Sequence, residues 1–112
     1  MTTQRWNDKI WLAQLAEDPA FSDELDTLTS DCAYADPMPD LVLDLSAVKH
    51  VNSSNLSQML RLRKLAIDRD AKLKLAGPRD SVWAALLATG LDKVFEFTAD
   101  SATALAQLQM RR

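Results

Sequence analysis

Residues 41–66 read LVLDLSAVKHVNSSNLSQMLRLRKLA, and within this stretch the hydrophobic pattern changes from that of a strand to that of a helix. Residues 41–45 form a short apolar run interrupted only by Asp44, which is typical of a strand buried on both faces. Apolar residues then return at helical spacing from Leu56 to Ala66, with charged residues between them. The stretch therefore predicts a central strand, a polar loop and an amphipathic helix.

On the N-terminal side of this stretch, the pattern predicts a hairpin and a helix. Two strands, at 4–6 and 10–15, are joined by a tight turn at 6–9 that is rich in turn-forming residues. Asp18 and Pro19 suit the start of a helix, which must end before the closely spaced prolines that follow it. The apolar stripe of that helix consists of Phe21, Leu25, Leu28 and Cys32.

On the C-terminal side, two further strands alternate with two helices. The strands are expected at 72–76 and 94–97. The helix between them ends at Gly90 in a left-handed cap, and the last helix is capped by Asp100 or Ser101. The order of elements predicts a single α/β domain over all 112 residues, with a four- to five-stranded, mostly parallel sheet, an N-terminal hairpin and about four helices.

The composition limits the class of protein. With 47% hydrophobic and 26% charged residues, the chain is expected to be globular, and we expect Trp6 and Trp11 on the hairpin to be mostly buried. No apolar run approaches the roughly 20 residues of a membrane helix, and MTTQRWNDK lacks the order of a signal peptide. The net charge of −3 argues against binding to nucleic acid. We therefore expect a cytoplasmic protein without membrane insertion.

Charge is unevenly distributed along the chain. Residues 1–46 contain ten acidic residues against Arg5 and Lys9, a net charge of −8, whereas residues 47–112 contain six acidic and eleven basic residues, a net charge of +5. Because no linker separates the two halves, we expect these charges to interleave on one mixed, solvated surface.

The residue types usual in catalytic and metal sites are scarce. His50 is the only histidine and Cys32 the only cysteine, which leaves no set for a metal cage or a disulfide. With only Gly77 and Gly90, the chain has no glycine-rich phosphate loop. Asp44 is interpreted as the cap of a neighbouring loop. We expect neither an enzyme nor a bound cofactor or metal.

The stretch HVNSSNL at 50–56 follows the central strand, where open α/β sheets usually place their functional site. Ser53, Ser54 and Asn55 are all favoured helix N-cap residues, and Asn55 with Gln58 resembles a capping box. With the preceding LVLDL, the stretch resembles the signature of the STAS domain, the family of anti-sigma-factor antagonists and their relatives. LKLAGPRDSVWAALLATGLDKVFEF is similar to the second hallmark of that family, and DSATALAQL resembles its last helix.

The resemblance implies a regulatory module that is not an enzyme. In signalling members of the family, a serine kinase that is also the anti-sigma factor phosphorylates the first serine after an aspartate, and a phosphatase reverses the modification. By position, this phosphoacceptor is Ser53, with Ser54 as the alternative. A phosphate adds about −1.5 to −2 charges, which a helix N-terminus stabilises.

Two positions depart from the family's pattern. Asn52 stands at the aspartate position and Asn55 at the glycine position. Loss of the acid weakens the expected engagement of a kinase, and we expect the Asn55 side chain to project toward an approaching partner. Two alternatives remain open: an antagonist switched by phosphate, and a constitutive subunit that serves as a signalling scaffold or as the partner of a transporter ATPase in lipid traffic. At this length, a domain fused to a transporter is not expected.

In both alternatives, the expected partner-binding surface combines the loop with the exposed side of the helix after it. It consists of His50, Asn52, Ser53, Ser54, Asn55, Ser57, Arg61 and Lys64. Arg61 and Lys64 lie three residues apart on the polar face, and we expect them to steer an acidic protein partner, so that their joint replacement by glutamate slows association. The chain itself is expected to be a monomer or a weak homodimer.

Overall fold

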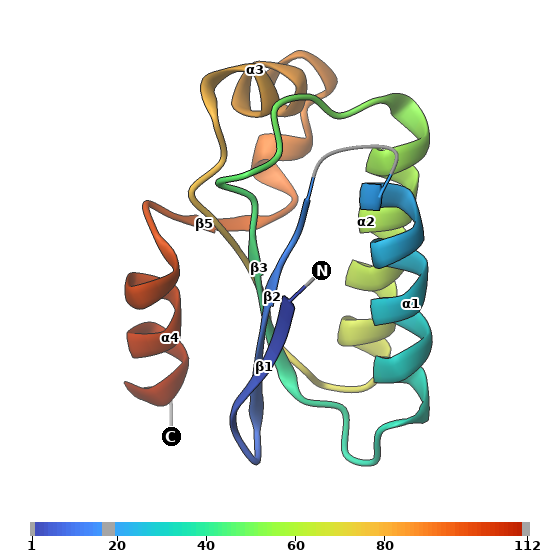
Figure 1. The fold of residues 1–112 in the computed structure, drawn as a ribbon, viewed down its shortest axis with the longest axis vertical. Helices are drawn as coiled ribbons and strands as arrows, with labels where there is room; N and C mark the ends of the chain where they lie inside the picture. The colour runs from blue at the N-terminus through green and yellow to red at the C-terminus, as the bar shows by residue number, and fades with distance from the viewer. Residues whose placement is uncertain (1, 17–19, 111–112) are drawn as a thin grey trace.

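One five-stranded sheet organises the fold of the computed structural model, which describes residues 2–16 and 20–110 (Figure 1). The strands follow one another across the sheet in chain order, as β1 (Thr2–Asn7), β2 (Ile10–Gln14), β3 (Asp40–Asp44), β4 (Leu73–Ala76) and β5 (Glu96–Thr98). β1 and β2 pair antiparallel as a hairpin, and the remaining neighbours pair parallel. The predicted α/β architecture is confirmed.

Helices cover both faces of this sheet. In the described part of the chain they are α1 (Ala20–Tyr34), α2 (Ser53–Asp68), α3 (Asp80–Thr89) and α4 (Ser101–Met110), with a 3₁₀ turn η1 (Leu91–Lys93) after α3. Figure 1 shows α1 and α2 side by side on one face, α4 on the other face and α3 at one end of the sheet. A parallel strand must return over a face of the sheet by a crossover, which is why the helices alternate with the strands.

The main hydrophobic core lies between the sheet and the pair α1–α2. All four residues of the predicted α1 stripe are buried in it, namely Phe21, Leu25, Leu28 and Cys32. β3 contributes Leu41 and Leu43 to this core, while Val42 points to the opposite face. β3 is therefore the doubly buried central strand that the run at 41–45 predicts.

A smaller core lies under α4. Four sheet residues meet three residues of the helix there, and the set is Ile10, Leu12, Val42, Ala76, Ala104, Leu105 and Leu108. The Asp100 carboxylate accepts a 2.8 Å hydrogen bond from the Thr103 amide at the start of α4, so Asp100 is the cap, as one of the two predicted alternatives had it.

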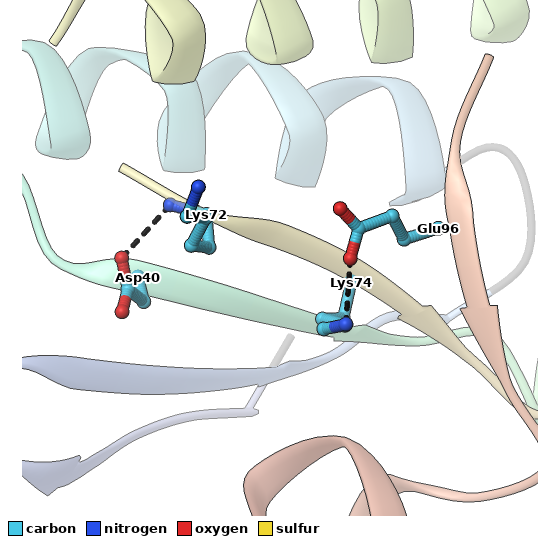
Figure 2. A network of polar contacts seen from close by, with 4 residues as sticks. All are labelled: Asp40, Lys72, Lys74 and Glu96. Atoms are coloured by element: carbon cyan, nitrogen blue, oxygen red, sulfur yellow. Dashed lines mark hydrogen bonds and ion pairs between the residues drawn. The ribbon is translucent and has the colours of Figure 1, made fainter. Parts of the chain in front are cut away.

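Polar contacts join β3, β4 and β5 across the sheet (Figure 2). The Lys72 amide donates to Asp40 Oδ1 at 2.8 Å, next to the start of β4. The Lys74 ammonium lies 2.6 Å from Glu96 Oε2, although Lys74 is only 7% exposed. Because a buried ammonium without a partner is strongly unfavourable, this ion pair explains how β4 carries a charged residue on a covered face.

Some predicted boundaries are wrong. The last strand begins at Glu96 and not at residue 94, because the Gly90 cap, with φ of 76°, leads directly into η1. The hydrogen bond from the Val94 amide to the Leu91 carbonyl then keeps Val94 in the turn. The predicted helix start at Asp18 and Pro19 lies outside the described residues.

The burial predicted for the hairpin tryptophans is wrong for Trp6. Its side chain is 50% exposed, and it lies in β1, where the pairing with β2 shifts register between Arg5 and Asn7. β1 is an edge strand with a neighbour on one side only, so little of the fold can cover it. Trp11 on β2 is half-buried, and the Arg5 guanidinium lies 5.3 Å from the centre of its ring.

Candidate functional site

The loop that leads from β3 to α2 is fixed at its beginning by Asp44. One Asp44 carboxylate oxygen accepts hydrogen bonds from the Ser46 amide at 2.9 Å and the Ser46 hydroxyl at 2.6 Å. Val48 is fully buried, and its amide donates to the Leu45 carbonyl. The interpretation of Asp44 as a loop cap is confirmed, and the loop that carries the predicted site is held at the carboxyl end of the central strand.

The N-terminus of α2 is closed by two asparagines. The Asn52 side chain accepts a 2.8 Å hydrogen bond from the Asn55 amide, and the Asn55 side chain accepts a 3.0 Å hydrogen bond from the Asn52 amide. This reciprocal pair is a capping box in which Asn55 occupies the position usually held by Glu or Gln. The predicted box of Asn55 with Gln58 is therefore wrong: the cap is Asn52, and both asparagines that depart from the family's pattern belong to it.

Asn55 points into the protein, which corrects the expectation that it projects toward a partner. It is 0% exposed, and its Nδ2 donates to the Ser22 hydroxyl of α1 at 2.9 Å. Gln58, one turn later, donates to the Ser22 carbonyl at 2.9 Å and to Asp26 Oδ1 at 3.0 Å. The physical reason is that residue 55 lies on the side of α2 that packs against α1, where a buried amide finds partners.

Ser53 and Ser54 are the exposed residues at this helix start. They occupy the first two positions of α2, where backbone amides have no acceptor within the helix. A helix N-terminus with such amides favours negative charge. The geometry can therefore present two hydroxyls to solvent and accommodate an anionic group on either of them.

His50 lies on the same loop and is exposed, as is Lys49. Together with the start of α3 they line a shallow open cleft whose residues are Lys49, His50, Arg79, Asp80 and Ser81. The Ser81 hydroxyl donates to the Lys49 carbonyl, which ties the loop to α3. His50 is thus placed at the mouth of the site, on the loop and not within α2.

The exposed side of α2 continues the surface away from the loop. Ser57, Arg61 and Lys64 are all exposed on it, and the Lys64 ammonium lies 2.9 Å from Asp68. Two other arginines of this region have structural contacts instead. Arg63 donates to the Val94 carbonyl at 3.0 Å, and Arg69 donates to the Ala33 carbonyl at the end of α1 at 3.0 Å.

Side chains that could hold a metal ion do not gather anywhere in residues 2–16 and 20–110: no group of three or more His, Cys, Asp or Glu was found there. Among the same residues, no helix is both long and apolar enough to cross a membrane.

The comparison with protein families identifies the kind of domain. The family model described as the STAS domain matches residues 7–104. The chain belongs to the STAS family. The matched residues include the whole β3–α2 region and its capped helix start.

The STAS fold is also found in a solved structure. A Thermotoga maritima protein described as a candidate anti-sigma factor antagonist superimposes with a TM-score of 0.78, covering 96% of this chain and 93% of that one, at 14% sequence identity. At this identity the likeness establishes the fold alone. A search among curated protein sequences finds no match.

Sequence reasoning misses the α1 side of this STAS site. Ser22 and Asp26, which hold Asn55 and Gln58, lie 32 to 36 residues away in the sequence. A local pattern does not reveal contacts over that separation. The one available signal is the spacing Asn-x-x-Asn at 52–55, which fits a capping box as well as a box that starts at Ser53 or Ser54 would.

Proposed function

We propose that this STAS domain is a regulatory protein-binding module of the anti-sigma-factor antagonist type, with Ser53 as the acceptor of a regulatory phosphate. The observation that carries the proposal is the exposed Ser53–Ser54 pair at the capped start of α2. A serine kinase that also acts as the binding partner and anti-sigma factor transfers the terminal phosphate of its nucleoside triphosphate to Ser53 and releases the diphosphate. A phosphatase reverses the modification, and Ser54 is the alternative acceptor. Such a kinase and its nucleotide place the exchange in the cytoplasm of a bacterium.

The chemistry of the helix start supports a reversible switch. A phosphate on Ser53 adds about −1.5 to −2 charges next to backbone amides that favour them. The Asn52–Asn55 box and the bonds to Ser22 hold α2 independently of the Ser53 hydroxyl. The modification therefore changes the surface that a partner meets and leaves the fold in place.

The partner-binding surface combines the loop and the exposed side of α2. It comprises His50, Asn52, Ser53, Ser54, Ser57, Arg61 and Lys64, while buried Asn55 acts by positioning the others. The exposed Arg61 and Lys64 favour an acidic partner and raise its rate of association. A phosphate at Ser53 opposes that attraction and so favours release.

The direct test is the intact mass of the protein isolated from its native cells, with the modified residue mapped. The expected result is one added phosphate on Ser53 that is absent from Ser53→Ala and retained in the control Ser30→Ala, which changes an exposed serine of α1 outside the partner-binding surface. Phosphate on Ser54 instead would move the acceptor by one residue. A chain that stays unmodified across growth conditions, and that purified serine kinases of this type leave untouched, would overturn the switch.

A constitutive binding subunit is the second candidate, and the Asn52–Asn55 pair favours it. The acid and the glycine of the family's pattern are replaced by two residues that are used in capping the helix. A STAS subunit of this kind binds a signalling scaffold or a transporter ATPase permanently. It predicts that the unmodified chain co-purifies with one partner and that Ser53→Ala and Ser53→Asp leave the complex intact.

A further inference from the structure

The charged residues of α1 and α2 are mostly of opposite sign. α1 contains four acidic residues and no basic one, and its exposed acids are Asp23, Asp26 and Asp31. The neighbouring face of α2 exposes Arg61 and Lys64, with Asp68 as the acid paired to the lysine. An acidic helix and a basic helix therefore lie side by side on one open face of the molecule (Figure 1).

The two helices run in the same direction, and hydrogen bonds fix how far one is shifted along the other. Five side-chain hydrogen bonds connect them or the residues directly after them; they come from Asn55, Gln58 and Arg69 and join residues that differ by 32 to 36 in number. By this offset, Lys64 lies level with Asp31, and Ile67 lies level with Tyr34. Arg61 lies about one and a half turns beyond Asp23, a separation that a long side chain can largely span.

We propose that this α1–α2 face binds a second copy of the chain about a two-fold axis parallel to the helices. That axis places α1 of each copy against α2 of the other and so makes two equivalent contacts. In each contact, Asp23 and Asp31 of one copy face the two basic residues Arg61 and Lys64 of the other. A two-fold interface uses the same patch on both copies, which a surface with both charges side by side satisfies. An axis perpendicular to the helices sets acid against acid and is disfavoured.

Two exposed apolar residues support the same arrangement. Tyr34 is 89% exposed in the last turn of α1, and Ile67 is 56% exposed in the last turn of α2. Because both residues lie at the same height along the helix axes, the proposed two-fold axis brings Tyr34 of each copy to the last turn of α2, which contains Ile67, in the other copy. Exposed ion pairs alone contribute little, so these two apolar contacts, both at the C-terminal end of the helices, add what the charges lack.

The dimer has a direct consequence for the proposed partner site. It covers Arg61 and Lys64 in both copies, and it leaves the two Ser53 residues at the same end of the assembly. A second copy and a heterologous partner therefore compete for the exposed side of α2. The dimer does not depend on phosphorylation, and it stands or falls separately from the proposed switch.

The test uses two charge-reversed variants of the full chain. In the first, Asp23→Lys and Asp31→Lys make α1 basic; in the second, Arg61→Glu and Lys64→Glu make α2 acidic. Asp26 is left unchanged because its carboxylate bonds Gln58 within the chain. Sedimentation is measured at low salt (about 0.01 M) and high salt (about 1 M), where the Debye length falls from about 30 to about 3 Å.

The unaltered chain is expected to dimerise at low salt and to dissociate at high salt. Each variant alone should associate about tenfold or more weakly, since both copies then present like charges to each other. An equimolar mixture should form a heterodimer close to the original strength, because both α1–α2 contacts regain opposite signs. This recovery also shows that both variants are folded.

Arg79→Glu with Lys93→Glu is the matched control, since it changes the charge equally outside the proposed interface. This control should dimerise as the unaltered chain does. An unaltered chain that stays monomeric at millimolar concentration and low salt overturns the proposal and leaves the basic side of α2 to a heterologous partner. A mixture that fails to associate, or a control that weakens the dimer as much as the α2 variant does, overturns it too.

Discussion

The two faces of the sheet hold their helices in different ways. On one face, α1 and α2 are joined to each other by side-chain hydrogen bonds, such as that from Asn55 to Ser22, and share a large core of fully buried side chains. On the other face, the ten-residue α4 rests on a small apolar patch and starts at the Asp100 cap. The positions of α1 and α2 are therefore fixed by each other as well as by the sheet, whereas α4 is positioned by the sheet and its cap alone.

This difference explains where the candidate site lies. A surface that another protein binds needs a rigid support, and the capped start of α2 is held by side-chain hydrogen bonds to α1. Four predictions test this difference, in decreasing order of the change that each should produce.

The largest effect is expected from equal truncations on the two faces. Leu62 of α2 is 0% exposed and Leu108 in the last turn of α4 is 1% exposed. Leu62→Ala should lower the free energy of unfolding by about 3–5 kcal/mol and Leu108→Ala by about 2–3 kcal/mol, because a short terminal helix can close the cavity more easily than two locked helices. Urea unfolding of both variants measures the losses. Equal losses, or a larger loss at Leu108, would contradict the difference between the faces.

The hydrogen bonds between α1 and α2 come next. Asn55→Ala removes a buried amide and leaves the Ser22 hydroxyl and the Asn52 amide without their bonds to it. The expected loss is about 1–3 kcal/mol, because several hydrogen bonds of a fully buried side chain are lost together. Ser57→Ala, on the exposed side of the same helix, is the control and should stay within about 0.5 kcal/mol. If both variants unfold at the same urea concentration, the network does not stabilise the layer.

Alkaline pH tests the tightness of the α1–α2 core through Cys32. Burial, assisted by the charge of Asp31, raises the pKa of the Cys32 thiol from 9.0 to about 12. Between these values the unfolded chain releases a proton that the folded chain keeps, so stability is full below pH 9 and falls as pH rises. The loss at pH 10 is about 1 kcal/mol.

Cys32→Ala is the control for this pH dependence, because other groups also titrate above pH 9. The variant should lose less stability than the unaltered chain between pH 8 and 10, as measured by urea unfolding at each pH. Identical losses in the two proteins would show that the thiol ionises as easily in the folded chain as in the unfolded one.

The α4 face gives the smallest and opposite pH effect. The Thr103 amide hydrogen bond lowers the pKa of Asp100, so its contribution to stability is present above the ordinary pKa and is lost as pH falls through the lowered one. Asp100→Asn should therefore weaken α4 slightly at neutral pH and leave it unchanged in acid. Hydrogen exchange of the Thr103 amide at both pH values measures this, and equal weakening at both would contradict it.

The sequence predicts the fold well because each element carries its own local signal. The run at 41–45, the α1 stripe and the left-handed cap at Gly90 each depend on neighbouring residues, and all three are confirmed. Trp6 and the 3₁₀ turn at Leu91–Lys93 are missed because exposure at a sheet edge and a turn after a cap depend on surrounding structure.

The candidate site is predicted in place but not in detail. Asn52, Ser53, Ser54 and Asn55 are all suitable N-cap residues, so local sequence cannot select among them. Packing against α1 makes the selection, because it turns Asn55 inward and leaves the serines outside. The roles of His50, Arg61 and Lys64 in binding stay predictions.

The inward-facing asparagine also limits how this sequence can change over generations. Replacing Asn55 by the family's glycine in one step would remove its hydrogen bond to the Ser22 hydroxyl and half of the capping box at once. Changes at positions 22 and 58 would have to precede or accompany it, since residues that share buried hydrogen bonds do not tolerate substitution independently. Ser22, Asn55 and Gln58 are thus expected to be inherited as a set, and a descendant that regains the glycine should have altered its first helix too.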